Sequence, residues 1–296
     1  MTAQLLEDRV RKLPLWKHAV SLEVLKGGIS NTSFIATDGA DRFVVRCGDD
    51  IPAHHVSRDR ERAVSEAAYQ AGLSPELVHG EPGIMVFRYI AGRTYAEADM
   101  RANAPRIVAL LKRCHADLRR LVRGPVNFFW AFHVIRDNAH KLSGTGGRWA
   151  AELPRFTELA DRLEAVQMPM PIVFGHHDLL PGNFIDDGKR LWLIDWEYGS
   201  YGTALFDLAN LAANGSFDEA GEAELLTLYF DSEPSEQLRR SFDAMKAASA
   251  LREATWALVS KIHLDAPGAD YESHAAEFFR RTDAAVQRFE ERYGKL

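Results

Sequence analysis

A polar loop that leads into a hairpin is the feature of this sequence that most restricts its fold. The apolar run 171–174 before the loop is typical of a buried strand. Two more apolar runs, 184–185 and 191–194, are separated by a tight-turn sequence of two aspartates, a glycine and a lysine. The pattern therefore predicts a hairpin with Asn183 at its entry and Asp195 at its exit, so that both side chains can face one ion.

Three polar residues of this region have the spacing that phosphoryl transfer from ATP needs. Asp178 and Asn183 stand five residues apart on the loop, and Asp195 follows twelve residues after Asn183. Such transfer uses a carboxylate near the attacking hydroxyl, together with an amide and a second carboxylate that hold Mg²⁺ on the phosphates. The spacing predicts Asp178 as the catalytic carboxylate and Asn183 and Asp195 as Mg²⁺ ligands.

Other polar residues of the same region have simpler interpretations. Asp186 and Asp187 are typical turn formers rather than metal ligands. His176 is predicted to be a structural histidine that braces the loop, and His177 is predicted to be exposed. None of these four residues is expected to take part in the chemistry.

The segment 26–34 has the composition of a phosphate-binding loop. It joins two predicted strands and contains a glycine pair at 27–28. Glycines let backbone N–H groups approach a phosphate closely, and Ser30, Asn31 and Thr32 add short donor side chains. Because glycine pairs are also common in ordinary hairpin turns, this loop alone does not decide the function.

Arg46 is the candidate cation for the phosphates. It ends the apolar strand that follows the glycine loop, where its side chain could reach the α- and β-phosphates. Such an arginine needs an acid to hold it, and the next predicted helix offers Glu61 and Glu66. Either glutamate could instead be a solvated charge on the helix surface, which is the usual place for such residues.

Composition and charge narrow the class of protein. The 296 residues carry a net charge of −6 and are 46% hydrophobic, as expected of a globular protein. No run of lysine or arginine points to nucleic acid as a partner. The chain has no apolar run of membrane-spanning length and no signal-peptide pattern, so we expect a cytoplasmic protein without membrane insertion. Cys47 and Cys114 lie in apolar segments and are predicted to be buried free thiols.

Secondary-structure signals divide the chain into two parts. Residues 1–90 are predicted to form a nucleotide-binding N-lobe, and residues 91–296 a C-lobe with the catalytic loop, the metal site and the acceptor pocket. Residues 91–92 are the candidate linker between them. Strands are predicted at 21–26, 33–37, 42–47, 77–79 and 84–90, and a helix at 56–71. Beyond the linker, apolar recurrence predicts helices at 104–121, 150–166, 204–213, 220–230, 236–263 and 272–293.

Several segments together resemble one known family. The spacing H-x-D-x-x-x-x-N at 176–183 is similar to the protein-kinase catalytic loop, and Ile-Asp-Trp-Glu-Tyr at 194–198 stands where D-F-G would be. The chain resembles the choline/ethanolamine kinase family of the bacterial type, within the aminoglycoside-phosphotransferase-like small-molecule kinases. The resemblance runs from about residue 25 to residue 281, and its other matching segments are 27–34, 44–46, 58–61, 72–75, 88–92 and 206–210.

The resemblance implies a protein-kinase-like bilobal fold of the α+β class, with a small β-rich N-lobe and a larger, mainly helical C-lobe. It also implies a kinase that uses ATP and Mg²⁺ to phosphorylate a small-molecule alcohol. Asp178 would orient the substrate hydroxyl and accept its proton, and Asn183 and Asp195 would bind Mg²⁺. Arg46 would contact phosphate.

Two further roles come from the same resemblance. Glu61, rather than Glu66, would hold Arg46 in place. Asp207, in the segment Phe-Asp-Leu-Ala-Asn, would brace the metal and catalytic loops. Asp207 would thus be structural, whereas Glu61 belongs with Ser30, Asn31, Thr32 and Arg46 to the expected nucleotide-binding residues.

The acceptor pocket departs from the family pattern. Where the family carries an acid after this segment, the chain has Asn214, and where the family often has a second tryptophan after Trp256, the chain has Val259. Tyr271 could supply another wall. Since a permanent cation is held by aromatic faces and negative charge, we expect choline to be a poor substrate that improves in an Asn214→Glu, Val259→Trp variant.

Three functions stay open at this point. The first is a kinase of a small amino alcohol, choline or ethanolamine. The second is a kinase of another small hydroxyl compound: an aminoglycoside, homoserine, a thiosugar or a sugar. The third is a non-catalytic, ligand-binding pseudokinase, which the intact set of Asp178, Asn183 and Asp195 disfavours.

Overall fold

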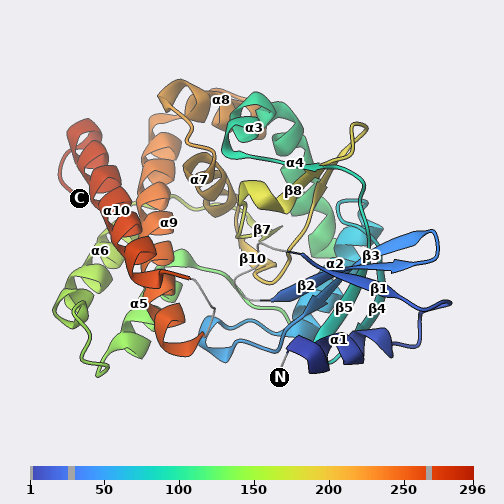
Figure 1. The fold of residues 1–296 in the computed structure, drawn as a ribbon. Coiled ribbons are helices and arrows are strands. Elements are labelled where there is room, and N and C mark those ends of the chain that lie inside the picture. The colour runs from blue at the N-terminus through green and yellow to red at the C-terminus, as the bar shows by residue number, and fades with distance from the viewer. Residues whose placement is uncertain (1–2, 26–30, 265–268) are drawn as a thin grey trace.

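A five-stranded antiparallel sheet forms the N-terminal part of the fold (Figure 1). The computed structural model describes residues 3–25, 31–264 and 269–296. In β2 and β3 every second side chain is buried, as expected of strands that cover a core with one face. The strands, in their spatial order, are β1 (Ser21–Leu25), β2 (Thr32–Asp38), β3 (Asp41–Cys47), β5 (Ile84–Arg88) and β4 (Leu77–Glu81).

Two helices pack on this sheet. Helix α1 (Ala3–Arg11), which the sequence reasoning did not predict, contributes the fully buried Val10 to a small core beneath the strands. Helix α2 (Arg58–Gln70) instead places Val64 in the larger core of the C-terminal part. Because α2 joins that core, a charged residue on it can reach the loops around the predicted catalytic residues.

The predicted hairpin is present. Strands β8 (Phe184–Asp186) and β9 (Leu191–Leu193) pair antiparallel, and β6 (Arg93–Thr94) adds a third strand to β8. Gly92, in the predicted linker, passes so close to the hairpin that a Cβ there would lie 2.7 Å from the Asp186 carbonyl oxygen. Only residues 89–92 therefore separate the last residue of β5 in the large sheet from β6, which pairs with the hairpin.

Helices dominate the rest of the chain. Several agree with the predicted ranges to within about three residues: α4 (Ala104–Leu121), α6 (Leu153–Ala165), α7 (Ala204–Asn214), α8 (Glu219–Phe230), α9 (Glu236–His263) and α10 (Tyr271–Tyr293). Short 3₁₀ turns are η1 (Pro52–His54), η2 (Ala150–Glu152) and η3 (Pro181–Asn183). Figure 1 shows α9 and α10 side by side, on the opposite side of the molecule from the sheet.

Four elements of the C-terminal part were not predicted as such. Helix α5 (Ala131–Leu142) buries residues 132, 135, 139 and 142, which is a helical period that the sequence does carry. The short helix α3 (Glu97–Ala102) and strand β6 were also missed. Strand β10 (Ser200–Thr203) pairs with β7 (Ile172–Gly175), and its four residues, with Gly202 among them, are too short a run to give a clear strand signal.

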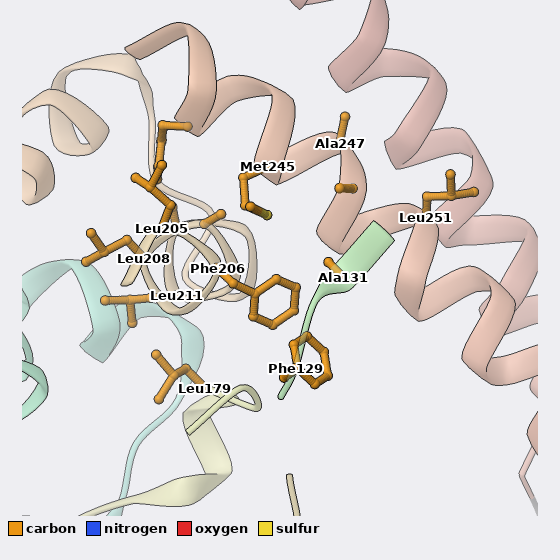
Figure 2. Close-up of a cluster of buried hydrophobic side chains, with 14 of the residues drawn as sticks. Phe129, Ala131, Leu179, Leu205, Phe206, Leu208, Leu211, Met245, Ala247 and Leu251 are labelled. Atoms are coloured by element: carbon orange, nitrogen blue, oxygen red, sulfur yellow. The ribbon is translucent and has the colours of Figure 1, made fainter. Parts of the chain in front are cut away.

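Helix α7 lies at the centre of the C-terminal core. Nine of its eleven residues, including two polar ones, are buried, so it is covered on all sides. Figure 2 shows Phe206 and Leu211 of α7 in one apolar cluster with Met245 of α9 and Leu179 of the predicted catalytic loop. The core therefore fixes the position of that loop.

Both cysteines are buried and free, as predicted. Burial raises the pKa of the Cys47 thiol to about 12 and the pKa of the Cys114 thiol well above its usual value. No helix in the described ranges has the length and apolar character that a membrane span requires.

Candidate active site

The backbone of the predicted catalytic loop, residues 176–183, is held by one buried carboxylate. Asp207 of α7 accepts hydrogen bonds from the N–H groups of His176 (2.9 Å) and His177 (2.7 Å) and from Nε2 of His115 (2.8 Å). Burial by itself would raise the pKa of Asp207, but the nearby His177 and the bond from His115 hold it well below its usual range. Asp207 therefore braces the catalytic loop as an anion.

The two histidines of the loop lie in the interior. His176 braces the loop as predicted, because its Nε2 donates to the Ile194 carbonyl at 3.0 Å. The prediction that His177 is exposed is wrong. Its φ of 65° turns the ring inward, where it stacks on Phe129 at 4.6 Å and donates from Nε2 to the Ser200 carbonyl at 3.1 Å. Burial lowers the pKa of His177 to about 4, so the ring is neutral.

The structure brings Asp178, Asn183 and Asp195 to one cleft of about 650 Å³. The amide Nδ2 of Asn183 donates to the Asp178 carbonyl at 2.8 Å, and the Ile194 N–H donates to the Asn183 carbonyl at 3.0 Å. Asp195 itself has a left-handed backbone, with φ of 71°. Non-glycine residues in this conformation cluster at functional sites, where surrounding bonds hold them.

Asp178 stands in an environment that favours its protonated form. Withdrawal from water raises its pKa well above the usual value, and the charge of Arg252 opposes that rise. The charges of Glu253 and Asp195 raise it further. A carboxylate of raised pKa is a stronger proton acceptor once it is ionised.

Arg46 joins the large sheet to this cleft. Its Nη1 donates to Oε1 of Glu61 and its Nη2 to Oδ1 of Asp195, both at 2.7 Å. Glu61 is fully buried, whereas Glu66, the other candidate partner, is exposed on the same helix. The pairing of Arg46 with Glu61 that the resemblance implied is therefore present, and the bond to Asp195 comes in addition.

Arg58 and Glu197 complete this network, and sequence reasoning gave neither of them a role. Nη1 of Arg58 donates to Oε2 of Glu61 at 2.6 Å and to Oε2 of Glu197 at 2.9 Å. All three side chains are at most 8% exposed. Arg58 precedes Glu61 by three residues, which places both on one face of α2 and was the available signal. Glu197 comes from 139 residues away, so local sequence could not indicate its partner.

The phosphate-loop candidates lie in different places. Ser30 lies outside the described residues. Asn31 lines the cleft, as does Ser33, which pairs with Arg46 across the sheet. Thr32 is exposed at the start of β2 and is not among the residues that line the cleft.

Of the predicted acceptor residues, Trp256 and Asn214 line the cleft. Trp256 donates from Nε1 to the Tyr198 hydroxyl at 2.9 Å. Tyr271 does not line the cleft but lies buried against Trp256, with ring centres 6.2 Å apart. The amide of Asn214 donates to the Leu179 carbonyl at 3.3 Å, so its side chain supports the catalytic loop.

Val259 does not belong to the acceptor pocket. It is fully buried in the core of the C-terminal part and is not among the residues that line the cleft. The expectation that Val259→Trp adds an aromatic wall for choline is therefore wrong. The larger ring would overpack the core, which typically costs about 1–3 kcal/mol of stability.

The residues present fit a magnesium ion. Oδ1 of Asp195 is used by Arg46 and Nδ2 of Asn183 by the loop backbone. Among the described residues, no hydrogen bond engages Oδ2 of Asp195 or Oδ1 of Asn183. Mg²⁺ prefers such oxygen ligands and commonly takes one or two from protein, with the rest from phosphates and water.

Comparisons with known proteins identify the family. The profile of the Phosphotransferase enzyme family matches residues 21–244. The chain belongs to this family. A crystal structure of a choline/ethanolamine kinase family protein from Mesorhizobium loti is 28% identical, with a TM-score of 0.78, over 97% of this chain and 95% of that one. The prediction of a small-molecule kinase with a protein-kinase-like fold is thereby confirmed.

One further relative and one further solved structure are similar to this chain. A probable ethanolamine kinase of Arabidopsis thaliana is 28% identical over 215 residues, which are 64% of this chain and 55% of that protein. A crystal structure of LicA in complex with AMP is 21% identical, with a TM-score of 0.76, over 97% of this chain and 98% of that one. The second likeness concerns the fold alone.

Proposed function

We propose that this protein transfers the γ-phosphoryl group of ATP, in the presence of Mg²⁺, to the hydroxyl of a small amino alcohol. The observation that carries the proposal is the meeting of Asp178, Asn183, Asp195 and Arg46 at one cleft. Membership of the phosphotransferase family supports it. The ethanolamine kinase among the relatives supports the acceptor class, and the AMP complex of LicA supports an adenine nucleotide.

Each residue has a defined task in this reaction. Asp178 accepts the proton of the attacking hydroxyl, and its raised pKa suits it to this task. Arg46, fixed by Glu61, contacts the phosphates. Asn183 and Asp195 would hold Mg²⁺, which when bound neutralises charge on the phosphates. The protein otherwise contributes by positioning the reactants.

The bonds around the loop explain how the positions are kept. Asp207 fixes the backbone before Asp178, and the Asn183–Asp178 bond fixes the backbone after it. The Ile194–Asn183 bond then sets Asp195 beside Asn183. Helix α7, the turn η3 and the residue that follows β9 therefore define one geometry.

A panel of acceptors tests the proposal. The purified protein is incubated with Mg²⁺, ATP and one alcohol at a time, with choline, ethanolamine, aminoglycosides and common sugars in the panel. Phosphorylated product is detected by ³¹P NMR, and a parallel sample contains EDTA. We expect product with at least one amino alcohol and none with EDTA. ATP binding without product from any of these alcohols, or from serine or homoserine, would overturn the proposal in favour of a pseudokinase.

A further inference from the structure

The cleft does not end at Asp178 but continues between α9 and α10. Its α9 wall runs from Trp256 to Lys246, and its α10 wall runs from His274 to Arg288. At 1.5 Å per residue these walls are about 15 Å and about 21 Å long. A groove of this length exceeds what choline or ethanolamine can fill, so it leaves room for further groups on the acceptor.

Positive charge prevails along this groove. Besides the ion pair of Arg252 with Glu253, its walls carry Lys246, Arg281 and Arg288 against Glu222, which is paired with Lys246 at 2.6 Å. Arg281 is paired with Glu277, which does not line the groove. Arg288 makes no hydrogen bond or ion pair with the residues that the structure describes. The groove therefore has an excess of cations beyond the catalytic residues.

Arg252 of α9 lines the same cleft as Asp178 and is only 3% exposed. Its guanidinium is packed between two rings, 4.9 Å from the centre of Tyr198 and 5.6 Å from the centre of Phe129. Nη1 donates to Glu253 at 2.7 Å, and Glu253 is itself held by His274 at 3.0 Å. The position of the guanidinium is thus fixed from several sides.

One edge of this guanidinium has no hydrogen-bond partner among the residues that the structure describes. Nε is buried without a hydrogen-bond partner, and no described residue accepts a hydrogen bond from Nη2. The Nε–Nη2 edge is a fork of two parallel N–H donors, which matches two oxygens of a carboxylate or a phosphate. A buried donor without a partner is costly, so an anionic group that satisfies this edge would be favoured.

We propose that the acceptor is an amino alcohol that also carries an anionic group, a carboxylate or a phosphate, which binds Arg252. This inference rests on the proposed function and names its substrate class. The hydroxyl lies at Asp178, the anionic group meets the free edge of Arg252, and Arg281 and Arg288 add positive potential along the groove. Choline is disfavoured relative to such an acceptor, because it has no anionic group to satisfy the Nε–Nη2 edge of Arg252.

Matched acceptor pairs test this proposal, since each pair differs by one carboxylate. Serine is compared with ethanolamine, and homoserine with 3-amino-1-propanol. Glycerophosphoethanolamine, which carries hydroxyls, an amine and a phosphodiester, forms the phosphate arm. Dissociation constants are measured by calorimetry in the presence of a non-hydrolysable ATP analogue, and kcat/KM is measured with ATP. We expect the acid-bearing acceptors to bind at least about tenfold more tightly.

Variants connect the preference to the residue. Arg252→Gln removes the charge and the fork of donors. Arg252→Lys keeps the charge but removes the paired donors. Either variant can be used if the other does not fold. Both should reduce the ratio of the affinity for the acid-bearing partner to the affinity for its decarboxylated counterpart. Arg280→Ala is the control, since this arginine of α10 is 74% exposed and does not line the groove.

The outcomes separate the two proposals. Equal or tighter binding of the decarboxylated partners, no binding of any acid-bearing acceptor, or an unchanged preference in the Arg252 variants would overturn the inference. Tighter binding of glycerophosphoethanolamine than of homoserine assigns the anion as phosphate, and the reverse assigns it as carboxylate. Absence of phosphorylated product with all acceptors refutes the proposed function, whereas the binding preference still decides this inference.

Discussion

Asp178 is the residue on which the proposed chemistry depends most directly. The Asp178→Asn change keeps the shape of the side chain and removes the proton acceptor. We expect turnover to fall by about two orders of magnitude or more, with nucleotide binding largely kept. Steady-state kinetics and calorimetry with ATP measure both quantities. The control is Asp187→Asn in the exposed hairpin turn, and near-normal turnover of the Asp178 variant would refute the assignment.

Arg46 is predicted to act on the nucleotide and not on the acceptor. The Arg46→Ala change removes the guanidinium that is fixed by Glu61, so the KM for ATP should rise while the KM for the acceptor changes little. Arg42→Ala is a matched control, because Arg42 is exposed on the same strand. A larger effect on the acceptor than on ATP would contradict the role.

For individual residues, the sequence predicted roles best where the chemistry allows only a few residue types. Spacing alone singled out Asp178, Asn183 and Asp195, which the fold brings to one cleft. It did not indicate that His177 is interior, because the left-handed turn that buries its ring depends on Asp207, thirty residues later. The unsatisfied edge of Arg252 was also invisible, since it is defined by side chains from several elements.

Helix α7 acts as the support of the catalytic loop. The Asp207→Ala change would leave the N–H groups of His176 and His177 buried without partners, and each such group costs about 1–3 kcal/mol. We therefore expect a loss of about 2–5 kcal/mol in the free energy of unfolding, measured in urea. Glu224→Ala, at an exposed position on α8, should change stability by less than about 0.5 kcal/mol.

The pH dependence of this effect has a defined sign. The pKa of Asp207 is lowered in the folded state, so its stabilisation is present at neutral pH. It declines as pH falls below the ordinary aspartate pKa of about 3.9. The difference between the wild type and Asp207→Ala should therefore shrink below about pH 4. A difference that grows on acidification would show that Asp207 is not the anion described above.

Elements with a strong apolar period were predictable, and elements defined by their neighbours were not. Helix α4 was predicted at its observed bounds because its apolar residues recur along one face. Strand β10 is only four residues long and contains a glycine. It is a strand because it pairs with the edge of β7. Helix α5 shows that a readable period can also be overlooked when histidines interrupt it.

At the level of the whole molecule, Arg58 connects helix α2 to the C-terminal part of the chain. It links Glu61 of α2 to Glu197, and the Arg58→Ala change would leave both carboxylates buried with less compensation. Loss of one partner from a buried ion pair typically costs about 3–5 kcal/mol. Thermal and urea unfolding of Arg58→Ala are compared with Arg62→Ala, whose exposed pair should be worth less than about 1 kcal/mol. Equal losses of unfolding free energy in the two variants would show that the buried Arg58 pairs stabilise the fold no more than an exposed pair does.

The bilobal arrangement followed from the resemblance, and the boundary of the lobes at residues 90 and 91 stays a prediction. The groove between α9 and α10 could not be predicted from the sequence. The apolar period of each helix indicates which face is buried, but it does not indicate how the two helices pack against each other. Its charges lie on α9 and α10 at helical spacing, which is also the spacing of ordinary surface residues.

The burial of Cys47 and Cys114 has a practical consequence. Both thiols stay protonated near neutral pH, and a protonated thiol does not react with maleimides. Cysteines introduced at Asp59 and Arg280, which are exposed on α2 and α10, could therefore carry dyes or spin labels while the native pair is left in place. The wild-type chain is thus already a suitable background for spectroscopic measurement of whether the distance between these two positions changes when ligands bind.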